Sequence, residues 1–422
     1  MPHPLTRIIC QYLDSPVETL ANHKPLIDEM CAILCNITGM DLNPTVMSER
    51  NTATAKGNAV SPVVAGRCAW EILRSQVFIR GVYAAIRERL DSPDRDADST
   101  PLNILYAGTG PFGLLIVPLL PLLSAKEVQI TLLDIHDRSL TLLNKLIDEL
   151  DVRDRIAAIH CTDILKWPAP VAHYDLVVSE TMTAMLKAEP QVAIFAHLVS
   201  ALKPSGSLIP EQIQVNASLL AAGTFDEQSA IPLGRMFSLD RQTALAIASG
   251  DERCFSAQLV ILEHPAHYTD LQFTTEIVVY GDHRLTRGQC SLTMPFTRHK
   301  VRLEIGSTLE SRYVLNDRPD FEIRYKVTNA VNYDTPADSS DCSMFGIPHA
   351  KRLWQKVQLL KLNRLDPGIV QSEQDLDLQC YRALGLQYPD DLAELFSKDS
   401  LSDFESWVMT RNQSLTNHSA VS

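Results

Sequence analysis

The chain has 422 residues, of which 45% are hydrophobic and 21% are charged. This composition is typical of a globular protein, so disorder of the whole chain is excluded, and the length predicts about two or three domains. The formal charge is −13, from 38 basic and 51 acidic residues. It argues against nucleic acid as the main partner, because phosphate-binding surfaces need a basic field. It suits a small cationic substrate or a basic peptide.

The cysteines and the apolar runs indicate the compartment. Nine cysteines are scattered without the paired spacing of a zinc site, so we expect free thiols, a reducing compartment and no metal. The first residues lack a basic stretch followed by a long apolar run, and the longest apolar run, 114–123, is short and contains prolines. We therefore expect no signal peptide, no membrane partner and a cytoplasmic location.

The N-terminal part is predicted to be helical. Apolar residues recur every three or four positions over residues 1 to about 45, as from Leu26 to Ile37, which predicts an amphipathic helical segment within an extension over 1–60. The polar stretch 48–59 predicts a loop. Residues 62–90 show a strongly periodic helical pattern, which the prolines and charges of 91–101 end.

From residue 102 the pattern changes to short apolar runs that alternate with helix-length segments. Alternation of this kind predicts βαβ units and a parallel sheet, so 61–210 is expected to form a Rossmann-like α/β domain with its preceding helix. The expected strands are 103–107, 128–133, 156–161 and 175–178, and the expected helices are 137–150 and 190–201.

After Pro210 the chain is rich in β-forming runs. They predict an antiparallel, β-barrel-like domain over 211–332, with 224–252 as an inserted arm. The runs are 212–219, 257–263, 271–280, 300–305 and 321–327. Helical patterns at 350–361 and 378–410 predict a helical extension over 333–422, with a loop at 333–345 and a polar tail at 411–422.

The first predicted strand ends in a glycine-rich turn. Gly108, Gly110 and Gly113 have the spacing GxGxxG and precede a predicted helix, which suits close approach of the backbone to an adenosine-containing ligand. Asp134, twenty-four residues after Gly110, ends the second strand and can accept hydrogen bonds from ribose hydroxyls. Asp163 follows the third strand and can meet an adenine amino group, with a surface turn aspartate as the alternative. These positions suit a nicotinamide dinucleotide as well as S-adenosylmethionine.

Later motifs carry a resemblance to a known family. YDLVVSE (174–180) and LKPSGSLIP (202–210) resemble strand regions of class I methyltransferases, and SETMTAMLKAE (179–189) resembles the double-glutamate loop of the protein arginine methyltransferases. Ser179, Glu180, Met182 and Glu189 match that loop, whereas Thr181 stands for its aromatic residue and Thr183–Ala184 for its Gly-Tyr. The resemblance implies S-adenosylmethionine as cofactor, Glu180 and Glu189 as catalytic residues and Met182 in the substrate site.

The chemistry gives a reason for two glutamates. A guanidinium presents five N–H donors in a flat fork, and its high pKa makes prior removal of a proton unrealistic. Two carboxylates can clamp it and leave one nitrogen oriented for attack on a methyl group. The alternative is structural: Glu180 caps a helix and Glu189 is a solvated surface charge.

The resemblance extends to the preceding helix and fails in the second domain. Residues 66–86 are similar to the family's N-terminal helix, which implies that Arg74 meets the methionine carboxylate of the cofactor; an arginine at the helix surface is the alternative. The family's Thr-His-Trp loop is missing. LTMPFTRHK (292–300) makes His299 a candidate for substrate binding, and Trp354 in LWQK is expected to be buried on a helix. The family dimerises through an inserted arm, so a homodimer is expected.

The predicted function is therefore an S-adenosylmethionine-dependent N-methyltransferase. The altered loop and the missing triplet favour free arginine or a related small guanidino or amino compound as acceptor. The alternatives are a protein or peptide arginine methyltransferase, an enzyme for another amine or imidazole, a cofactor-binding scaffold without catalysis, and a nicotinamide enzyme.

Overall fold

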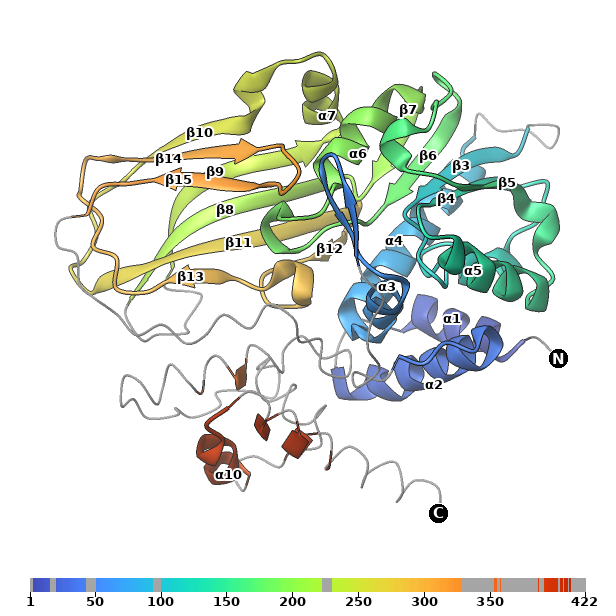
Figure 1. Ribbon diagram of the computed structural model, residues 1–422, viewed down its shortest axis with the longest axis horizontal. Coiled ribbons are helices and arrows are strands. Elements are labelled where there is room, and N and C mark those ends of the chain that lie inside the picture. Colours follow the sequence, from blue (N-terminus) through green and yellow to red (C-terminus); the bar gives the residue numbers. More distant parts are fainter. Residues whose placement is uncertain are drawn as a thin grey trace.

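The computed structural model describes residues 3–15, 20–42, 51–93, 100–221, 230–327 and 391–400, together with positions 353, 354, 357, 386, 403, 404, 406–408 and 410. In these residues a parallel sheet lies beside two antiparallel sheets, and the N-terminal helices pack next to the parallel sheet (Figure 1). No helix in the described ranges combines the length and the apolar character needed to cross a membrane.

The parallel sheet confirms the Rossmann-like domain. Its strand order is β5-β4-β3-β6-β7, and all four predicted strands lie within one residue of their expected bounds. The apolar runs of β3 and β4 are buried on both faces, as expected for a covered parallel sheet, whereas β5 at the sheet edge is partly exposed. The strands are β3 (Leu102–Ala107), β4 (Val128–Asp134), β5 (Ile156–Cys161), β6 (Tyr174–Ser179) and β7 (Leu202–Ile209). The order reverses between β3 and β6, and ligands bind at the carboxyl ends of strands at such a switch point.

Three helices are expected after residue 102, and two of them are present. They are α5 (Asp137–Glu149) and α6 (Gln191–Leu198), the latter continued by η6 (Val199–Ala201). The prediction of an α-helix directly after the glycine turn is wrong, because the chain there forms a 3-10 segment, η2 (Val117–Leu122). Pro118 and Pro121 explain this, because each removes an N–H donor that an α-helix would need.

The N-terminal region departs most from the prediction. The helical segment predicted for residues 1 to about 45 contains two helices, α1 (Pro4–Asp14) and α2 (Leu20–Thr38). The predicted loop contains a hairpin, β1 (Thr52–Thr54) and β2 (Gly57–Ala59). The helical pattern at 62–90 is not continuous: it divides into α3 (Pro62–Arg67), η1 (Cys68–Trp70) and α4 (Ile72–Leu90). Ser75 stabilises the break by donating its hydroxyl to the carbonyl oxygen of Ala69 at 3.1 Å.

The antiparallel part confirms the barrel-like domain. One sheet has the order β12-β11-β8-β9 with β13 paired to β11, and the other has the order β10-β14-β15. Stacked aromatic rings fill the space between them, with the ring centroids of Phe237 and Tyr313 5.1 Å apart. The elements are β8 (Gln212–Ala221), β9 (Ile231–Asp240), α7 (Arg241–Ala248), η8 (Glu252–Phe255), β10 (Ser256–Val260), β11 (Tyr268–Tyr280), β12 (His283–Leu285), η9 (Ser291–Thr293), β13 (Phe296–Arg298), β14 (Thr308–Val314) and β15 (Asp320–Arg324).

Two predictions in this domain are wrong. The arm expected at 224–252 is not an arm over residues 230–252, because β9 pairs with β8 and α7 packs against α6. Arg241 also donates to the carbonyl oxygens of Pro204 and Gly206 at 2.8 Å, which ties α7 to β7. This removes the feature from which a homodimer was expected. The strand expected at 300–305 is reduced to one bridge, between Leu303 and Val327.

Helix α4 joins the two parts of the molecule. A Cβ atom at Gly81 would lie 2.5 Å from Val279, so the helix can approach β11 closely only because this residue is glycine. Near the helix end, Arg89 donates to the Ser207 hydroxyl at 2.7 Å and to the Tyr280 hydroxyl at 3.3 Å. The helix is thus fixed between β7 and β11.

The C-terminal extension is described only in part. Helix α10 (Leu392–Ser397) lies within the predicted helical segment 378–410. Trp354 is buried in a helical position, as expected, and its ring stacks on Phe404 with 5.5 Å between centroids. Positions 353, 357, 403, 404, 406–408 and 410 are also helical, whereas 386, 391 and 398–400 are not. The other positions of 333–345, 350–361, 378–410 and 411–422 lie outside the described residues.

Candidate active site

The glycine turn after β3 has the conformation expected of a ligand-binding loop. Gly108, Gly110 and Gly113 have φ angles of 78°, 60° and 53°, which non-glycine residues rarely adopt. The backbone N–H groups of Gly108 and Thr109 donate to the carbonyl oxygen of Leu133 at 2.8 and 3.2 Å. The turn is therefore fixed against the end of β4.

Asp134 lies at the carboxyl end of β4 and is buried beside this turn. One oxygen accepts the Gly110 N–H at 2.8 Å, and the other accepts the His136 N–H at 2.8 Å. Burial raises the pKa of Asp134, while the His136 and Gly110 N–H groups act to lower it. The first oxygen also accepts the Thr109 hydroxyl at 3.5 Å. Each carboxylate oxygen has two acceptor sites, so the oxygen that accepts from His136 can still accept a ribose hydroxyl. Next to it, His136 Nε2 is buried, with no hydrogen-bond partner among the described residues.

Asp163 follows β5, as predicted, and already has a local role. Its carboxylate accepts the Leu165 N–H at 3.1 Å, which caps η4 (Ile164–Lys166), and it forms an ion pair with Lys166 at 3.3 Å. This is the turn aspartate that was the alternative reading. An adenine contact would have to use the remaining acceptor sites of the carboxylate.

The loop that carries both glutamates, residues 179–190, has a strained backbone. Met185, Leu186 and Ala188 have φ angles of 60°, 56° and 61° although none is glycine. Such conformations cost about 1–3 kcal/mol each and persist only where the surroundings impose them, which is typical of functional sites. The segment η5 (Ala184–Leu186) is therefore held by its neighbours, not by its own propensity.

Those neighbours come mainly from the antiparallel domain. The Thr275 hydroxyl of β11 accepts the Met185 N–H at 2.8 Å, and the Tyr313 hydroxyl of β14 donates to the Leu186 carbonyl at 2.7 Å. The Ala188 N–H donates to the Pro319 carbonyl at 2.7 Å. The second domain therefore sets the conformation of a loop that belongs to the first.

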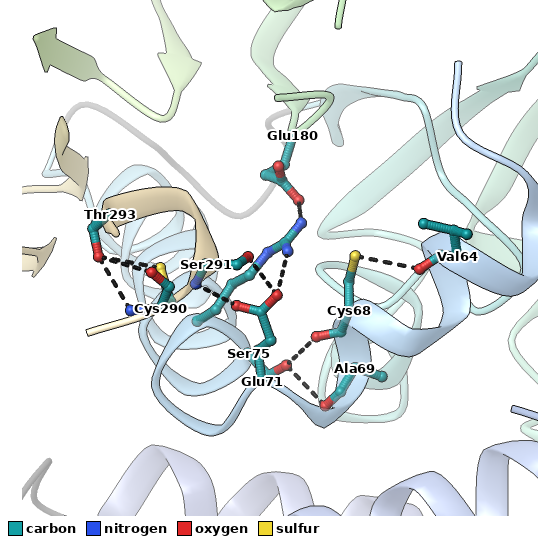
Figure 2. A network of polar contacts seen from close by, with 10 residues as sticks. Val64, Cys68, Ala69, Glu71, Ser75, Glu180, Cys290, Ser291 and Thr293 are labelled. Atoms are coloured by element: carbon teal, nitrogen blue, oxygen red, sulfur yellow. Dashed lines mark hydrogen bonds and ion pairs between the residues drawn. The ribbon is translucent and has the colours of Figure 1, made fainter. Parts of the chain in front are cut away.

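Arg74 joins the first glutamate to both domains. Its guanidinium donates to Glu71 at 3.0 Å and forms a close ion pair with Glu180. Glu71, in turn, accepts the N–H of Ser291 at 3.0 Å and its hydroxyl at 2.5 Å. Figure 2 shows this chain of contacts running from the η9 turn through Glu71 toward Glu180. All three charged side chains are at most 9% exposed, so the network lies in a low-dielectric region.

The carboxylates of Glu180 and Glu189 can accept further hydrogen bonds. The Glu180 oxygen that does not face Arg74 is buried, and the described residues offer it no hydrogen-bond partner. Burial raises the pKa of Glu189 to about 8; the Glu180 charge adds to this rise and Arg74 opposes it. The two carboxylates therefore lie close enough to interact. Buried polar atoms are normally paired, so this carboxylate oxygen is available to accept a hydrogen bond from a bound ligand.

Thr181 connects this loop to the glycine turn. Its N–H and its hydroxyl both donate to the Gln191 side-chain oxygen, at 2.7 and 3.1 Å. A Cβ atom at Gly108 would lie 2.5 Å from the Thr181 methyl group. Thr181, which stands where the arginine methyltransferases that the sequence resembles have an aromatic residue, is thus turned toward α6 and packs on the glycine turn.

The structure brings most of the predicted site residues to one edge of the parallel sheet. Gly108, Asp134, Asp163 and Glu180 follow the carboxyl ends of β3, β4, β5 and β6, and Arg74 reaches Glu180 from α4. Met182 is buried in the hydrophobic core, so its place in the substrate site stays a prediction.

His299 is placed differently. Its ring bonds to Asp270 at 2.8 Å, beside the first residues of β11, whereas the glutamate loop contacts that strand at Thr275. No hydrogen bond between described residues joins it to the Arg74 network.

Sequence analysis missed Glu71, Ser291 and Gln191. The spacing of three residues between Glu71 and Arg74 on a helical pattern could have indicated the first pair. Nothing in the sequence indicates Ser291, which is 220 residues away from its partner Glu71.

Other kinds of catalytic centre find less support here. Burial raises the pKa of Cys68, next to Arg74, to about 12, so this thiol stays protonated and is a poor nucleophile. In the described part of the chain, no group of three histidine, cysteine, aspartate or glutamate side chains could hold a metal ion.

Comparisons with known proteins agree with the predicted domain. A family model described as a methyltransferase domain matches residues 104–206. No curated protein matches the sequence. Among solved structures, the chain is similar to the Trypanosoma brucei PRMT1 enzyme-prozyme heterotetrameric complex with AdoHcy, with 12% identity and a TM-score of 0.43, over 63% of this chain and 93% of that chain.

The match to the family model confirms the class I methyltransferase domain. It also favours S-adenosylmethionine as the cofactor over a nicotinamide dinucleotide.

Proposed function

We propose that this chain is an S-adenosylmethionine-dependent N-methyltransferase whose acceptor is a guanidinium nitrogen of free arginine or a related small molecule. The observation that carries the proposal is the pair Glu180 and Glu189. One carboxylate has a buried oxygen without a partner among the described residues, and burial together with the Glu180 charge raises the pKa of the other to about 8, which a bound cation would lower.

The residues at the sheet edge fit the cofactor. The glycine turn has the left-handed backbone typical of such loops, and one Asp134 oxygen retains an acceptor site for a ribose hydroxyl. His136 Nε2, which has no hydrogen-bond partner among the described residues, lies next to it. The contacts of Arg74 with Glu71 and Glu180 use two of its five N–H donors, so others remain for a carboxylate. The cofactor supplies an electrophilic methyl group on a sulfonium.

The chain's own residues would then bind and orient the acceptor. Glu180, held by Arg74, accepts hydrogen bonds from one edge of the guanidinium, and Glu189 accepts from another. Two carboxylates keep the positive charge near themselves and leave the remaining nitrogen as the nucleophile. With the guanidinium bound, Glu189 is ionised, so it can take the proton that methylation of the attacking nitrogen makes acidic.

The experiment is a calorimetric titration of free arginine into the protein in the presence of S-adenosylhomocysteine. The unliganded Glu189 has a pKa of about 8, so it is mostly protonated at about pH 7. A bound guanidinium stabilises the ionised form and lowers this pKa. Binding should therefore release up to about one proton at about pH 7 and almost none at about pH 9, as read from buffers of different ionisation enthalpy.

Parallel titrations separate the acceptors. An arginine-containing peptide, a primary amine and an imidazole are titrated in the same way, and each is then incubated with S-adenosylmethionine to detect methylated product. Methylation of the peptide alone would replace free arginine by a protein substrate. Methylation of the amine or imidazole alone would overturn the guanidinium assignment. Cofactor binding without methylation of any of them would leave a scaffold.

A further inference from the structure

The β1–β2 hairpin lies against the loop that carries Glu189. An isolated two-stranded hairpin is at best marginally stable in water, so its place depends on contacts with the rest of the chain. In Figure 1 it rises from the start of α3 toward α6, between the parallel and antiparallel sheets. The mechanism proposed above assigns it no role.

Three hydrogen bonds hold the hairpin in place. The Asn58 N–H donates to the Ala188 carbonyl at 2.8 Å, which attaches it to the glutamate loop. The Lys56 ammonium donates to the Leu315 carbonyl at 3.0 Å, which attaches it to the chain between β14 and β15. Its base is fixed to the start of α3, because the Asn51 side-chain oxygen accepts the Ser61 N–H at 3.0 Å.

Gly57 makes the closest approach to the site. A Cβ atom there would lie 2.8 Å from the carbonyl carbon of Glu189, 2.9 Å from the Ala188 oxygen and 2.9 Å from the Pro190 nitrogen. All three are backbone atoms, which cannot rotate away as the end of a side chain can. The hairpin backbone therefore lies directly on the peptide groups that flank Glu189, beside the strained Ala188.

We propose that the β1–β2 hairpin is a positioning element for Glu189, in which Gly57 and the Asn58–Ala188 hydrogen bond hold that residue's backbone so that its carboxylate faces Glu180. Strained residues keep their conformation only under such external support. A displacement of about 1 Å in a reacting group can cost about a hundred-fold in rate, so small movements of this hairpin matter. The role of Glu189 toward the acceptor rests on the proposed function, but its positioning by the hairpin does not.

Gly57→Ala tests the inference, with Gly234→Ala as the matched control. Gly234 has φ +135°, against +134° for Gly57, so alanine meets similar backbone strain at both positions. Gly234 lies in β9, however, and the added carbon there meets only the end of the Leu259 side chain of β10, at 3.0 Å. The control therefore reproduces the strain without touching the glutamate loop.

The first readout needs no acceptor. In protein labelled with ¹³C at glutamate carboxyls, the Glu189 resonance is identified by its loss in Glu189→Gln and titrated with pH. We expect Gly57→Ala to lower the Glu189 pKa from about 8 by about one unit or more, because the carboxylate moves away from Glu180. Gly234→Ala should leave it unchanged. An unchanged Glu189 pKa in a folded Gly57→Ala protein would overturn the proposal.

The second readout uses free arginine as the probe. Gly57→Ala should weaken arginine binding about ten-fold or more while the affinity for S-adenosylhomocysteine stays within about two-fold, since the close contacts of Gly57 are with residues 188–190. Equal weakening of both ligands would indicate a general structural defect and count against positioning. If the wild type does not bind arginine but the Glu189 pKa still shifts, the substrate assignment fails and the positioning role stands.

A milder variant covers the case in which Gly57→Ala does not fold. Lys56 is exposed, and Lys56→Met removes only the hydrogen bond to Leu315. It should shift the Glu189 pKa in the same direction by a smaller amount. The absence of any shift in this variant, with Gly57→Ala unfolded, would count against the hairpin as the element that positions Glu189.

Discussion

Replacement of Glu180 by glutamine is expected to slow methyl transfer about a hundred- to a thousand-fold, the usual cost of removing one preorganised electrostatic contact. The variant keeps the shape of the side chain but removes its charge. Its amide also turns an N–H donor toward the donors of Arg74 or of the acceptor, because glutamine cannot offer two acceptor oxygens.

The measurement is turnover of S-adenosylmethionine with the acceptor identified by the titrations, together with the affinity for S-adenosylhomocysteine. We expect kcat to fall and cofactor affinity to change little. Glu276→Gln is the control, since Glu276 is exposed on β11. A Glu180→Gln protein that is folded and retains turnover close to that of Glu276→Gln would show that Glu180 is structural, as in the alternative reading.

Replacement of Arg74 by leucine is expected to lower the free energy of unfolding by about 3–5 kcal/mol, because it leaves Glu71 and Glu180 as buried carboxylates without their cation. Ser291 would still donate to Glu71, but Glu180 would lose its hydrogen-bonded partner. The loss should be visible as a lower midpoint in urea unfolding followed by circular dichroism.

The same helix supplies the control. Arg87 also forms two ion pairs, with Asp91 at 2.5 Å and Glu127 at 3.3 Å, but its side chain is 35% exposed. Arg87→Leu should cost only about 0–1 kcal/mol. If Arg74→Leu and Arg87→Leu destabilise the protein equally, the buried network does not join the domains as inferred.

The sequence predicts the parallel sheet well because its central strands, β3, β4 and β6, are buried on both faces. β3, β4, β5 and β6 appear as short continuous apolar runs between helix-length segments, a signal that does not depend on distant residues. The glycine turn was also predictable. The helix expected after it does not form, because Pro118 and Pro121 outweigh the strand–turn–helix pattern of the glycine motif.

Elements whose stability depends on distant contacts could not be predicted. The strands β1 and β2 read TAT and GNA, without apolar alternation, and they exist because the hairpin docks on residues 188–190 and 315. β9 contains Pro232 and Gly234, which weaken a strand pattern, so it was mistaken for part of an arm.

The site shows the same division. Glu180 and Glu189 were predicted from their spacing and from a family resemblance. The positive φ angles between them depend on Thr275, Tyr313 and Pro319, far along the chain. The link from Arg74 through Glu71 to Ser291 depends on the packing of η9 against the start of α4, which no local pattern indicates.

The central claim, that residues 104–206 form a working S-adenosylmethionine site, is tested most directly by calorimetric titration of S-adenosylhomocysteine into the full chain. The account predicts binding to one site, with a Kd of about 1–100 μM, weakened about ten-fold or more in Asp134→Asn, while NAD produces no binding heat. Binding of NAD with no response to S-adenosylhomocysteine would contradict it.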